Sequence, residues 1–364
     1  MILRSAEQVR RVFLILAGFT LLLLGIIMIF TPGPGTPVIL TGLGLLAAEF
    51  VWARRIIERV KRESTRLKDI LLPGRSRSHP LFLWNLRRLV LLNRKSPAGD
   101  AWSGKWALVT GASAGIGVAL AEELALGRTN LVLTARRKDR LEALAQRLTT
   151  TYQIRTEVFP ADLSDPTAPE RIYAFTQDKG IEVDLLINNA GFGKYGEFPS
   201  ADKQRLLEMV QVNCAAVIHL THLYLRGMTA RRRGDILVLA STASFQAVPY
   251  LSTYAATKAF DLLFAEGLAE EMKPYGIRVC ALCPGSTESE FHAVAGQEKF
   301  VHRAESAEKV ARTGLRALAA GQSYVISGLA NYLGAHGERL VPRRFVTRTA
   351  ARMFKPEEKT VAGN

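Results

Sequence analysis

Residues 106–117 read Trp-Ala-Leu-Val-Thr-Gly-Ala-Ser-Ala-Gly-Ile-Gly, a short apolar run that passes directly into a glycine-rich loop. The run Trp106–Val109 has the length and composition of a buried strand, and a helical pattern extends from Val118 through Leu126. The loop therefore lies where a phosphate-binding turn must lie, between a first strand and a first helix. Glycines lack a Cβ, so backbone amides can approach a pyrophosphate there. The glycines concerned are Gly111, Gly115 and Gly117.

Short apolar runs continue to alternate with helical periodicity beyond this loop. A helix is expected from Arg140 to Leu148. Strands that alternate with helices indicate a Rossmann-type, doubly wound parallel sheet of the α/β class. The further runs expected to form strands are Asn130–Thr134, Arg155–Phe159, Leu185–Ile187, Asp235–Ala240 and Arg278–Leu282.

Composition and charge narrow the function classes. The chain has 364 residues, 48% hydrophobic and 22% charged, which excludes a disordered or collagen-like protein. Three cysteines cannot form a disulfide framework and suit a reducing compartment.

The positive charge lies at the two ends of the chain. Of the net charge of +15, residues 1–100 carry +10 and residues 338–364 carry +4, whereas residues 101–337 carry only +1. Because the basic residues flank apolar sequence and do not form one patch on the central block, we expect no nucleic-acid partner.

The N-terminal part of the chain contains two apolar segments. Val12–Phe30 has 19 residues without a charge, and a helix of that length spans about 28 Å, close to the hydrocarbon thickness of a bilayer. A cleaved signal peptide is the alternative, but the run is too long for one and Thr31–Pro37 offers no cleavage site. Val38–Trp52 is shorter and contains Glu49. It either completes a transmembrane helical hairpin, which we favour, or forms a re-entrant or interfacial helix.

The flanking charges predict the orientation of this hairpin. Arginines precede the first segment and follow the second, whereas the Thr31–Pro37 turn carries no charge. The positive-inside bias therefore places both flanks, and the central block with them, on the cytoplasmic side of the inner membrane. The P-G-P-G motif at Pro32–Gly35 resembles that of a small bacterial membrane family named for it. That resemblance supports the topology only.

These observations predict four parts of the chain. Residues 1–53 form the transmembrane hairpin, 54–100 a basic amphipathic linker, 101–337 the catalytic domain and 338–364 a basic amphipathic C-terminal tail. Amphipathic stretches within the linker and the tail can either lie among lipid headgroups or pack against the domain. Both alternatives stay open, and membrane lipid is a predicted partner.

Motifs spread over the central block form one ordered set. Ser241 and Tyr254 lie 13 residues apart, and Tyr254 precedes Lys258 by four. This set resembles that of the short-chain dehydrogenase/reductase superfamily, from about Gly104 to about Gly328. The motifs are T-G-A-S-A-G-I-G at 110–117, A-D-L at 161–163, N-N-A-G at 188–191, Asn213, Ser241, Y-A-A-T-K at 254–258 and P-G at 284–285.

The resemblance implies a catalytic group made of Asn213, Ser241, Tyr254 and Lys258. On a helix, residues four apart share one face, so Lys258 would lie beside Tyr254. A tyrosine titrates near pH ~10, and a neighbouring ammonium lowers that pKa towards the operating range. We expect Tyr254 to exchange a proton with a substrate oxygen that Ser241 holds, and Asn213 to carry a water linking Lys258 to solvent. An exposed Tyr-x-x-x-Lys pair without a catalytic role would not account for the other motifs.

The end of the second expected strand predicts the cofactor. A site for NAD would place an acidic residue about 20 positions past the glycines, where this chain has Ala135 followed by Arg136. A guanidinium suits a ribose 2′-phosphate through paired charge-assisted hydrogen bonds. We therefore expect NADP(H) and assign its phosphate to Arg136. A solvated loop is the alternative for Arg136 and Arg137, but it does not explain the missing carboxylate.

The resemblance places further residues around the cofactor. Asp162 and Leu163 would border the adenine, and Ser289 keeps a hydroxyl where the family usually has threonine. Cys280 and Cys283 form a C-x-x-C, but the first lies in an expected strand, so we expect buried cysteines and no metal site. The expected cofactor-binding residues are Gly111, Ser113, Gly115, Ile116, Gly117, Arg136, Asp162, Leu163, Asn189, Ala190, Gly191, Tyr254, Lys258, Pro284, Gly285 and Ser289.

Together these features predict a membrane-anchored, NADP-dependent oxidoreductase that reduces a carbonyl or oxidises an alcohol. An enzyme held in a membrane meets molecules dissolved in the bilayer, so we expect a lipophilic small-molecule substrate. The stretch 104–113 after a membrane segment also resembles long-chain 3-ketoacyl reductases and hydroxysteroid dehydrogenases, which makes a 3-ketoacyl thioester the first substrate to consider. The alternative is a catalytically silent NADP(H)-binding sensor or scaffold tethered to the membrane. A homodimer is the protein assembly to test.

Overall fold

The computed structural model describes residues 15–21, 41–43, 45–46, 50, 101–296 and 304–356. The chain divides into two compact units, residues 1–91 and 92–364. In the first unit, residues 15–21 are helical, and a Cβ on Gly18 would come within 2.7 Å of the Leu46 side chain. The rings of Phe19 and Phe50 are 6.2 Å apart. The two apolar segments therefore touch, but the rest of the predicted hairpin and the linker 54–100 lie outside the described residues.

The second unit contains one sheet of seven parallel strands in the order β3-β2-β1-β4-β5-β6-β7. Neighbouring strands are in parallel register, for example Val109 opposite Leu133 and Ile187. Strand order reverses between β1 and β4, as in a doubly wound fold. The strands are β1 (Trp106–Thr110), β2 (Asn130–Thr134), β3 (Thr156–Val158), β4 (Val183–Asn188), β5 (Gly234–Leu239), β6 (Ile277–Cys283) and β7 (Tyr324–Ile326).

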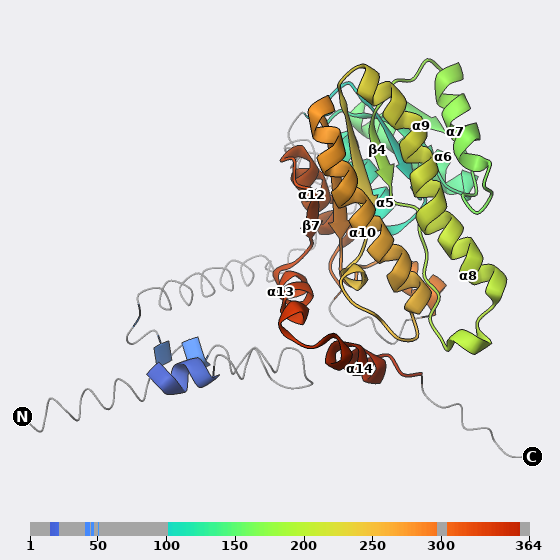
Figure 1. Cartoon of the computed structure of the whole chain (residues 1–364). Coiled ribbons are helices and arrows are strands. Elements are labelled where there is room, and N and C mark those ends of the chain that lie inside the picture. The colour runs from blue at the N-terminus through green and yellow to red at the C-terminus, as the bar shows by residue number, and fades with distance from the viewer. Residues whose placement is uncertain are drawn as a thin grey trace, which may run out of the picture. The chain divides into compact units, whose positions relative to one another are not determined.

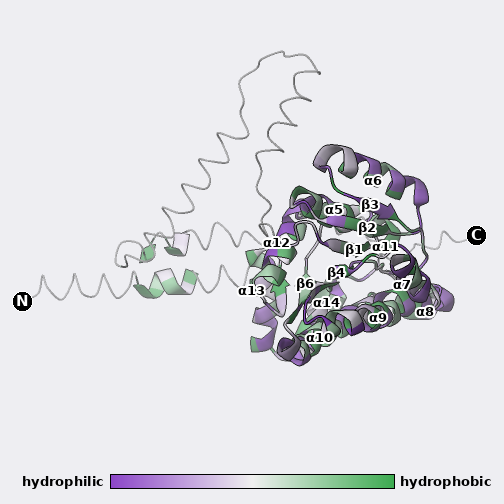
Figure 2. Ribbon diagram, turned by 90° about the horizontal axis from the view of Figure 1, so that it is seen from above, coloured by the Kyte–Doolittle hydropathy of each residue, from purple (hydrophilic) through white to green (hydrophobic). Residues whose placement is uncertain are grey.

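Helices cover both faces of this sheet (Figure 2). On one face α5, α6 and α12 bury apolar side chains against the strands, and on the other face α7, α9 and α10 do so. The helices are α5 (Gly115–Leu126), α6 (Lys138–Tyr152), α7 (Ala168–Asp178), α8 (Lys203–Val210), α9 (Ala216–Ala230), α10 (Ser252–Met272), α11 (Phe291–Ala295), α12 (Ala307–Ala319), α13 (Leu329–Gly337) and α14 (Arg343–Met353).

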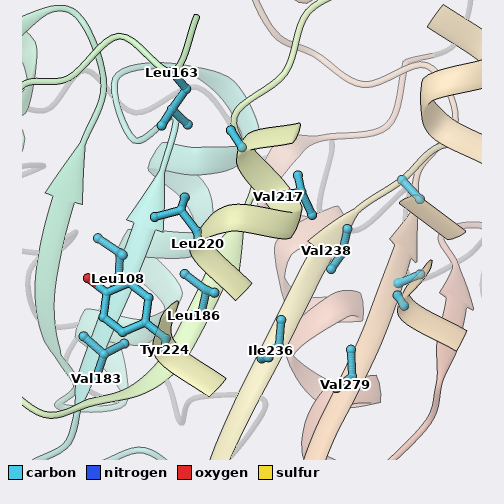
Figure 3. Packing of buried hydrophobic residues seen from close by; sticks show 14 of the residues in the cluster. Leu108, Leu163, Val183, Leu186, Val217, Leu220, Tyr224, Ile236, Val238 and Val279 are labelled. Carbon is cyan, nitrogen blue, oxygen red and sulfur yellow. The ribbon is translucent and has the colours of Figure 1, made fainter. Parts of the chain in front are cut away.

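The core forms because the strands are apolar on both faces. Leu108, Leu186 and Ile236 are fully buried on neighbouring strands (Figure 3). Leu220 and Tyr224 of α9 pack against this face. Burial of such side chains is worth about 1.5–3 kcal/mol each, so near-continuous apolar strands favour a sheet covered on both sides.

The structure adds two details to the predicted elements. The sheet has a seventh strand, β7, which pairs in parallel with β6. Only three residues long, β7 is too short to produce a periodic pattern. A π-helical turn, η2 (Gln211–Ala215), joins α8 to α9. Among the described residues, the resulting helix Lys203–Ala230 is the one whose length and apolarity would suffice to cross a membrane.

Candidate active site

The glycine loop between β1 and α5 owes its shape to contacts within the protein. Gly111 has a φ of +67° and Gly115 a φ of +54°, values that favour glycine. A Cβ on Gly117 would lie 2.7 Å from Nδ2 of Asn189 and closer still to the Gly111 carbonyl oxygen. Within the described domain no side chain caps α5 and its first turn has no acidic residue. The first-turn amides are therefore available to an anion.

Thr110 and Asn189 hold the ends of β1 and β4 together beside this loop. The Thr110 hydroxyl accepts hydrogen bonds from the amides of Asn189 and Ala190, both at 2.9 Å, and donates to the Ile187 carbonyl at 3.1 Å. The Asn189 side chain donates in turn to the Thr110 carbonyl at 2.8 Å. These bonds position the crevice at the point where the strand order reverses, which is where α/β sheets bind ligands.

A cavity of about 620 Å³ opens at this edge of the sheet. That volume lies within the range typical of small-molecule and cofactor sites. Every residue that the sequence assigned to the cofactor lines it, as do Ser241, Tyr254 and Lys258. These residues come from loops and helix starts between Gly111 and Ser289, so the fold brings the separate motifs to one place.

Asn213 is the one predicted site residue that does not line the cavity. It is 1% exposed and lies in the π-helical turn η2. Its Nδ2 donates to the Phe192 carbonyl and to the Thr257 hydroxyl, each at 3.0 Å, and its Oδ1 accepts from the Phe192 amide at 3.1 Å. A Cβ on Gly191 would lie 3.2 Å from this Oδ1 and 3.4 Å from Nζ of Lys258. Asn213 thus lies behind the cavity wall, close to the lysine.

Ser241 follows β5 at the start of a short turn, η3 (Thr242–Ser244). Its hydroxyl accepts from the Ala243 amide at 3.1 Å, and the Ser244 hydroxyl accepts from the Ser241 amide at 3.2 Å, which forms a reciprocal cap. The Ser244 hydroxyl also donates to the Lys258 carbonyl at 2.6 Å. This short turn therefore ties the serine to α10, the helix that carries Tyr254.

Tyr254 and Lys258 lie on one face of α10, as their spacing predicts. Burial raises the pKa of Tyr254 above its ordinary value, while the Lys258 ammonium and a hydrogen bond with Ser241 lower it. Lys258 therefore lowers the phenol pKa as expected, but burial outweighs it and the pKa stays above its ordinary value. The Tyr254 ring packs 5.2 Å from that of Phe291, which contributes to its burial.

Sequence reasoning missed Asp261, a buried carboxylate one turn beyond Lys258. Nζ of Lys258 donates to Asp261 Oδ2 at 2.9 Å and to the Leu239 carbonyl at 2.6 Å. Burial lowers the pKa of Lys258, but Asp261 and Tyr254 outweigh it and the pKa is raised. Burial raises the pKa of Asp261 to about 6, against the lowering effect of Lys258. The sequence did not identify Asp261, because a lysine and an aspartate three residues apart on a helix are also common on exposed helix surfaces.

The arginines after β2 lie at the other end of the cavity. Arg136 is mostly exposed and its guanidinium is 3.9 Å from the Asp162 carboxylate. Arg137 donates to the Ser113 hydroxyl at 3.1 Å and to Glu290 at 2.7 Å, so it is not a solvated loop residue. Glu290 therefore bridges the segment after β6 to the glycine loop through Arg137. This link joins residues 153 positions apart and has no sequence pattern of its own.

The C-terminal residues also reach the cavity. Met353 and Phe354 contribute to its lining, and Tyr195 donates a hydrogen bond to the Phe354 carbonyl at 2.9 Å. Phe354 packs on a small apolar cluster that includes Val248 and Leu251. The predicted tail, 338–364, thus supplies part of the wall beside Tyr254.

Cys280 and Cys283 are buried as expected. Burial raises the pKa of the Cys280 thiol to about 12 and raises that of Cys283 further. Both thiols stay protonated at neutral pH, so they act as small apolar core residues.

Comparison with known families gives two matches along the chain. Residues 105–299 match the family described as short chain dehydrogenase. Residues 11–63 match the family described as "Putative transmembrane protein (PGPGW)". The first match spans β1 to β6 and the cavity-lining residues up to α11, but not β7, Met353 or Phe354. The second match spans both apolar segments.

Individual relatives point the same way. A very-long-chain 3-oxoacyl-CoA reductase of Phaeosphaeria nodorum is 34% identical over 53% of this chain and 58% of its own. The inactive hydroxysteroid dehydrogenase-like protein 1 of Homo sapiens is 33% identical over 60% of this chain and 67% of its own. The chain spans little more than half the length of most of the curated relatives it matches.

Solved structures share the fold of the second unit. A short-chain dehydrogenase from Sphingobium yanoikuyae in complex with NADPH is 28% identical, with a TM-score of 0.60 over 71% of this chain and 98% of its own. The family match covers more than half of the chain and includes the glycine loop, Ser241, Tyr254 and Lys258. This chain therefore belongs to the short-chain dehydrogenase family.

Proposed function

We propose that this chain is a membrane-anchored, NADP(H)-dependent oxidoreductase that reduces a ketone of a lipophilic substrate, with a 3-ketoacyl thioester as the first candidate. The observation that carries the proposal is the convergence of Ser241, Tyr254 and Lys258 on one cavity with the glycine loop. The relative from Phaeosphaeria nodorum, a very-long-chain 3-oxoacyl-CoA reductase, supports the substrate class.

The residues of the cavity fit NADP(H). The uncapped start of α5 offers amides to a pyrophosphate. Arg136 and Arg137 offer guanidinium groups to a 2′-phosphate, and the position before them is Ala135 rather than an acid. The related Sphingobium yanoikuyae structure contains NADPH. When bound, NADPH supplies the hydride for carbonyl reduction.

The side chains of this chain would handle the proton. Tyr254 donates its phenolic proton to the carbonyl oxygen of the substrate, and Ser241 holds that oxygen by a hydrogen bond. The Lys258 ammonium stabilises the resulting phenolate. Asn213 holds the backbone at Phe192 and keeps its Oδ1 near Lys258, where a water would return a proton from solvent. Buried Asp261 keeps the ammonium charged throughout.

Substitution of Tyr254 by phenylalanine tests this assignment. Loss of a general acid costs about 10²–10⁴-fold in rate, so we expect Tyr254→Phe to lose NADPH oxidation with a long-chain 3-ketoacyl thioester. NADPH binding, measured by its fluorescence with the full chain in detergent, should be retained. Turnover that survives the substitution would refute the role of Tyr254.

A catalytically silent sensor or scaffold is the second candidate function. The name of the human relative, inactive hydroxysteroid dehydrogenase-like protein 1, supports it. Tight NADPH binding by the wild-type chain without turnover on 3-ketoacyl thioesters, steroid ketones or aliphatic aldehydes would favour this alternative. In that case Tyr254→Phe would change nothing measurable.

We propose further that both flanks of the N-terminal hairpin and the catalytic domain lie on the cytoplasmic side of the inner membrane. The match of residues 11–63 to a transmembrane family supports the anchor.

For the proposed homodimer, the domain presents exposed apolar residues such as Leu207, Val210 and Leu263 on α8 and α10. These are the residues through which a second copy of the chain would pair.

A further inference from the structure

Exposed apolar side chains are concentrated at the C-terminal end of the domain. Seven of the sixteen large apolar residues that are exposed in the described structure lie within residues 329–353. Exposure of large apolar groups in one region marks an interaction site more often than a free surface. The seven residues are Leu329, Tyr332, Leu333, Leu340, Val341, Phe345 and Met353.

The helix α14 combines this apolar character with positive charge. Arg344, Arg348 and Arg352 are spaced i, i+4, i+8 and form one row on its exposed side. Phe345 and Met353, each 63% exposed, form the adjacent row. Ala350, on the opposite side, is buried against the domain. The outward face of α14 is therefore half basic and half apolar.

The charges identify the kind of partner. Among the described residues, Arg344, Arg348 and Arg352 make no ion pair, and Arg339 and Arg343 add to the same charge. A second copy of this chain meeting the surface symmetrically would bring like charges together, which is unfavourable. Basic residues beside exposed Phe, Leu and Met side chains fit an anionic lipid surface, with the apolar row among the acyl chains and the arginines at the headgroups.

The same helix lies at the mouth of the catalytic cavity. Met353 and Phe354 line it, and Met353 is also exposed, so α14 borders its opening. Val294 of α11, 51% exposed, lines the cavity as well. The hydrogen bond from Tyr195 to the Phe354 carbonyl fixes the end of α14 to the domain. Figure 1 shows α14 at one end of the domain, beside the end of α10 that carries Tyr254.

We propose that α14, together with the exposed residues of α13, docks on an anionic lipid surface and that the catalytic cavity opens at this surface. A lipophilic substrate then passes from the bilayer past Met353 to Tyr254 without crossing water. The docking depends only on the surface of α13 and α14. The substrate route rests on the proposed function.

Site-directed fluorescence tests the docking with the full chain reconstituted in phosphatidylcholine vesicles, with and without phosphatidylglycerol. An environment-sensitive label on Phe345→Cys should be quenched by lipids that carry a spin label on the acyl chain. The quenching should be stronger with phosphatidylglycerol and weaker in high salt. A label on Gln146→Cys, an exposed position of α6, is the control and should not be quenched. The wild-type chain is the labelling blank: Cys280 and Cys283 are buried, and this chain measures any labelling of the partly exposed Cys214.

Three outcomes overturn the docking. Equal quenching at positions 345 and 146 would mean that α14 has no particular contact with lipid. Blue-shifted emission at position 345 without quenching would mean that protein covers the helix, either a second copy or the N-terminal unit. Quenching that does not respond to phosphatidylglycerol would refute the role of the arginines.

Turnover tests the substrate route separately. The combined change Arg344→Gln, Arg348→Gln and Arg352→Gln should lower kcat/KM for a long-chain 3-ketoacyl thioester carried in anionic vesicles by roughly tenfold or more. Turnover of a short, water-soluble ketone ester should stay unchanged, as should both activities of the exposed control Arg316→Gln. Equal loss on both substrates would refute the route. A wild-type chain that turns over neither substrate would refute the proposed function and leave the quenching result standing.

Discussion

Substitution of Asp261 by asparagine removes the negative charge beside Lys258 with little change in volume. The two groups are 2.9 Å apart, and both side chains are at most 5% exposed. Two unit charges at that distance attract by about 6 kcal/mol at an effective dielectric constant of ~20. Burial of both charges offsets most of this, but removal of one partner of a buried pair costs about 3–5 kcal/mol. We expect Asp261→Asn to lose that much free energy of unfolding near neutral pH.

The loss should depend on pH. Without Asp261, burial depresses the pKa of folded Lys258 below its unfolded value of ~10.4. The unfolded chain then binds more protons than the folded one, so the stability of the variant rises with pH until about pH 10. In the wild type, the pKa of Asp261 is raised to about 6. The contribution of this carboxyl group to the free energy of unfolding therefore falls with rising pH only between the pKa of an aspartate in the unfolded chain and pH 6. The other titratable groups near Asp261 are Tyr254 and Cys214, and the Cys214 thiol has its pKa raised to about 12, so it stays neutral.

Thermal unfolding of the full chain in detergent, followed by far-ultraviolet circular dichroism, measures the effect. For a domain of this size, a loss of about 1 kcal/mol in the free energy of unfolding lowers Tm by roughly 2–4 °C. We therefore expect the Tm of Asp261→Asn to lie about 6–20 °C below that of the wild type near pH 7. The difference should become smaller towards about pH 10. Asp178→Asn, at an exposed end of α7, is the matched control and should shift Tm little. A decrease that is the same at both pH values, or no decrease, would refute a charged buried pair.

Three further changes test other parts of the site. Arg136→Ala should raise KM for NADPH about tenfold or more and leave that for NADH little changed, because it removes a charge-assisted contact to the 2′-phosphate; equal effects on both would contradict the assignment. Gly117→Ala should prevent folding or abolish NADPH binding, since a Cβ there collides with the backbone of Gly111, whereas wild-type thermal stability would show that the loop can relax. Asp235→Asn should lower the free energy of unfolding by about 3–5 kcal/mol, because the carboxylate accepts from Arg278 at 2.6 Å and 2.8 Å; guanidinium denaturation with unchanged midpoint would refute this.

Local sequence was sufficient for the elements that carry a strong pattern. Six of the seven strands follow from apolar runs flanked by turns, and the glycine loop follows from its place between β1 and α5. The motif residues from Gly111 to Ser289 could be assigned to one cavity because parallel strands end at the same edge of the sheet. The three-residue β7 and the π-helical turn that holds Asn213 had no such pattern.

Contacts between distant segments could be identified only in the folded chain. Spacing along single strands and helices encodes the doubly wound domain, the apolar N-terminal segments and the serine, tyrosine and lysine of the proposed catalytic group. The folded chain was needed to show that Asp261 is buried against Lys258, that Glu290 joins Arg137, and that Met353 and Phe354 line the cavity with Tyr254. Such contacts depend on how helices pack on the sheet, and packing brings together residues whose separation in sequence carries no periodic signal.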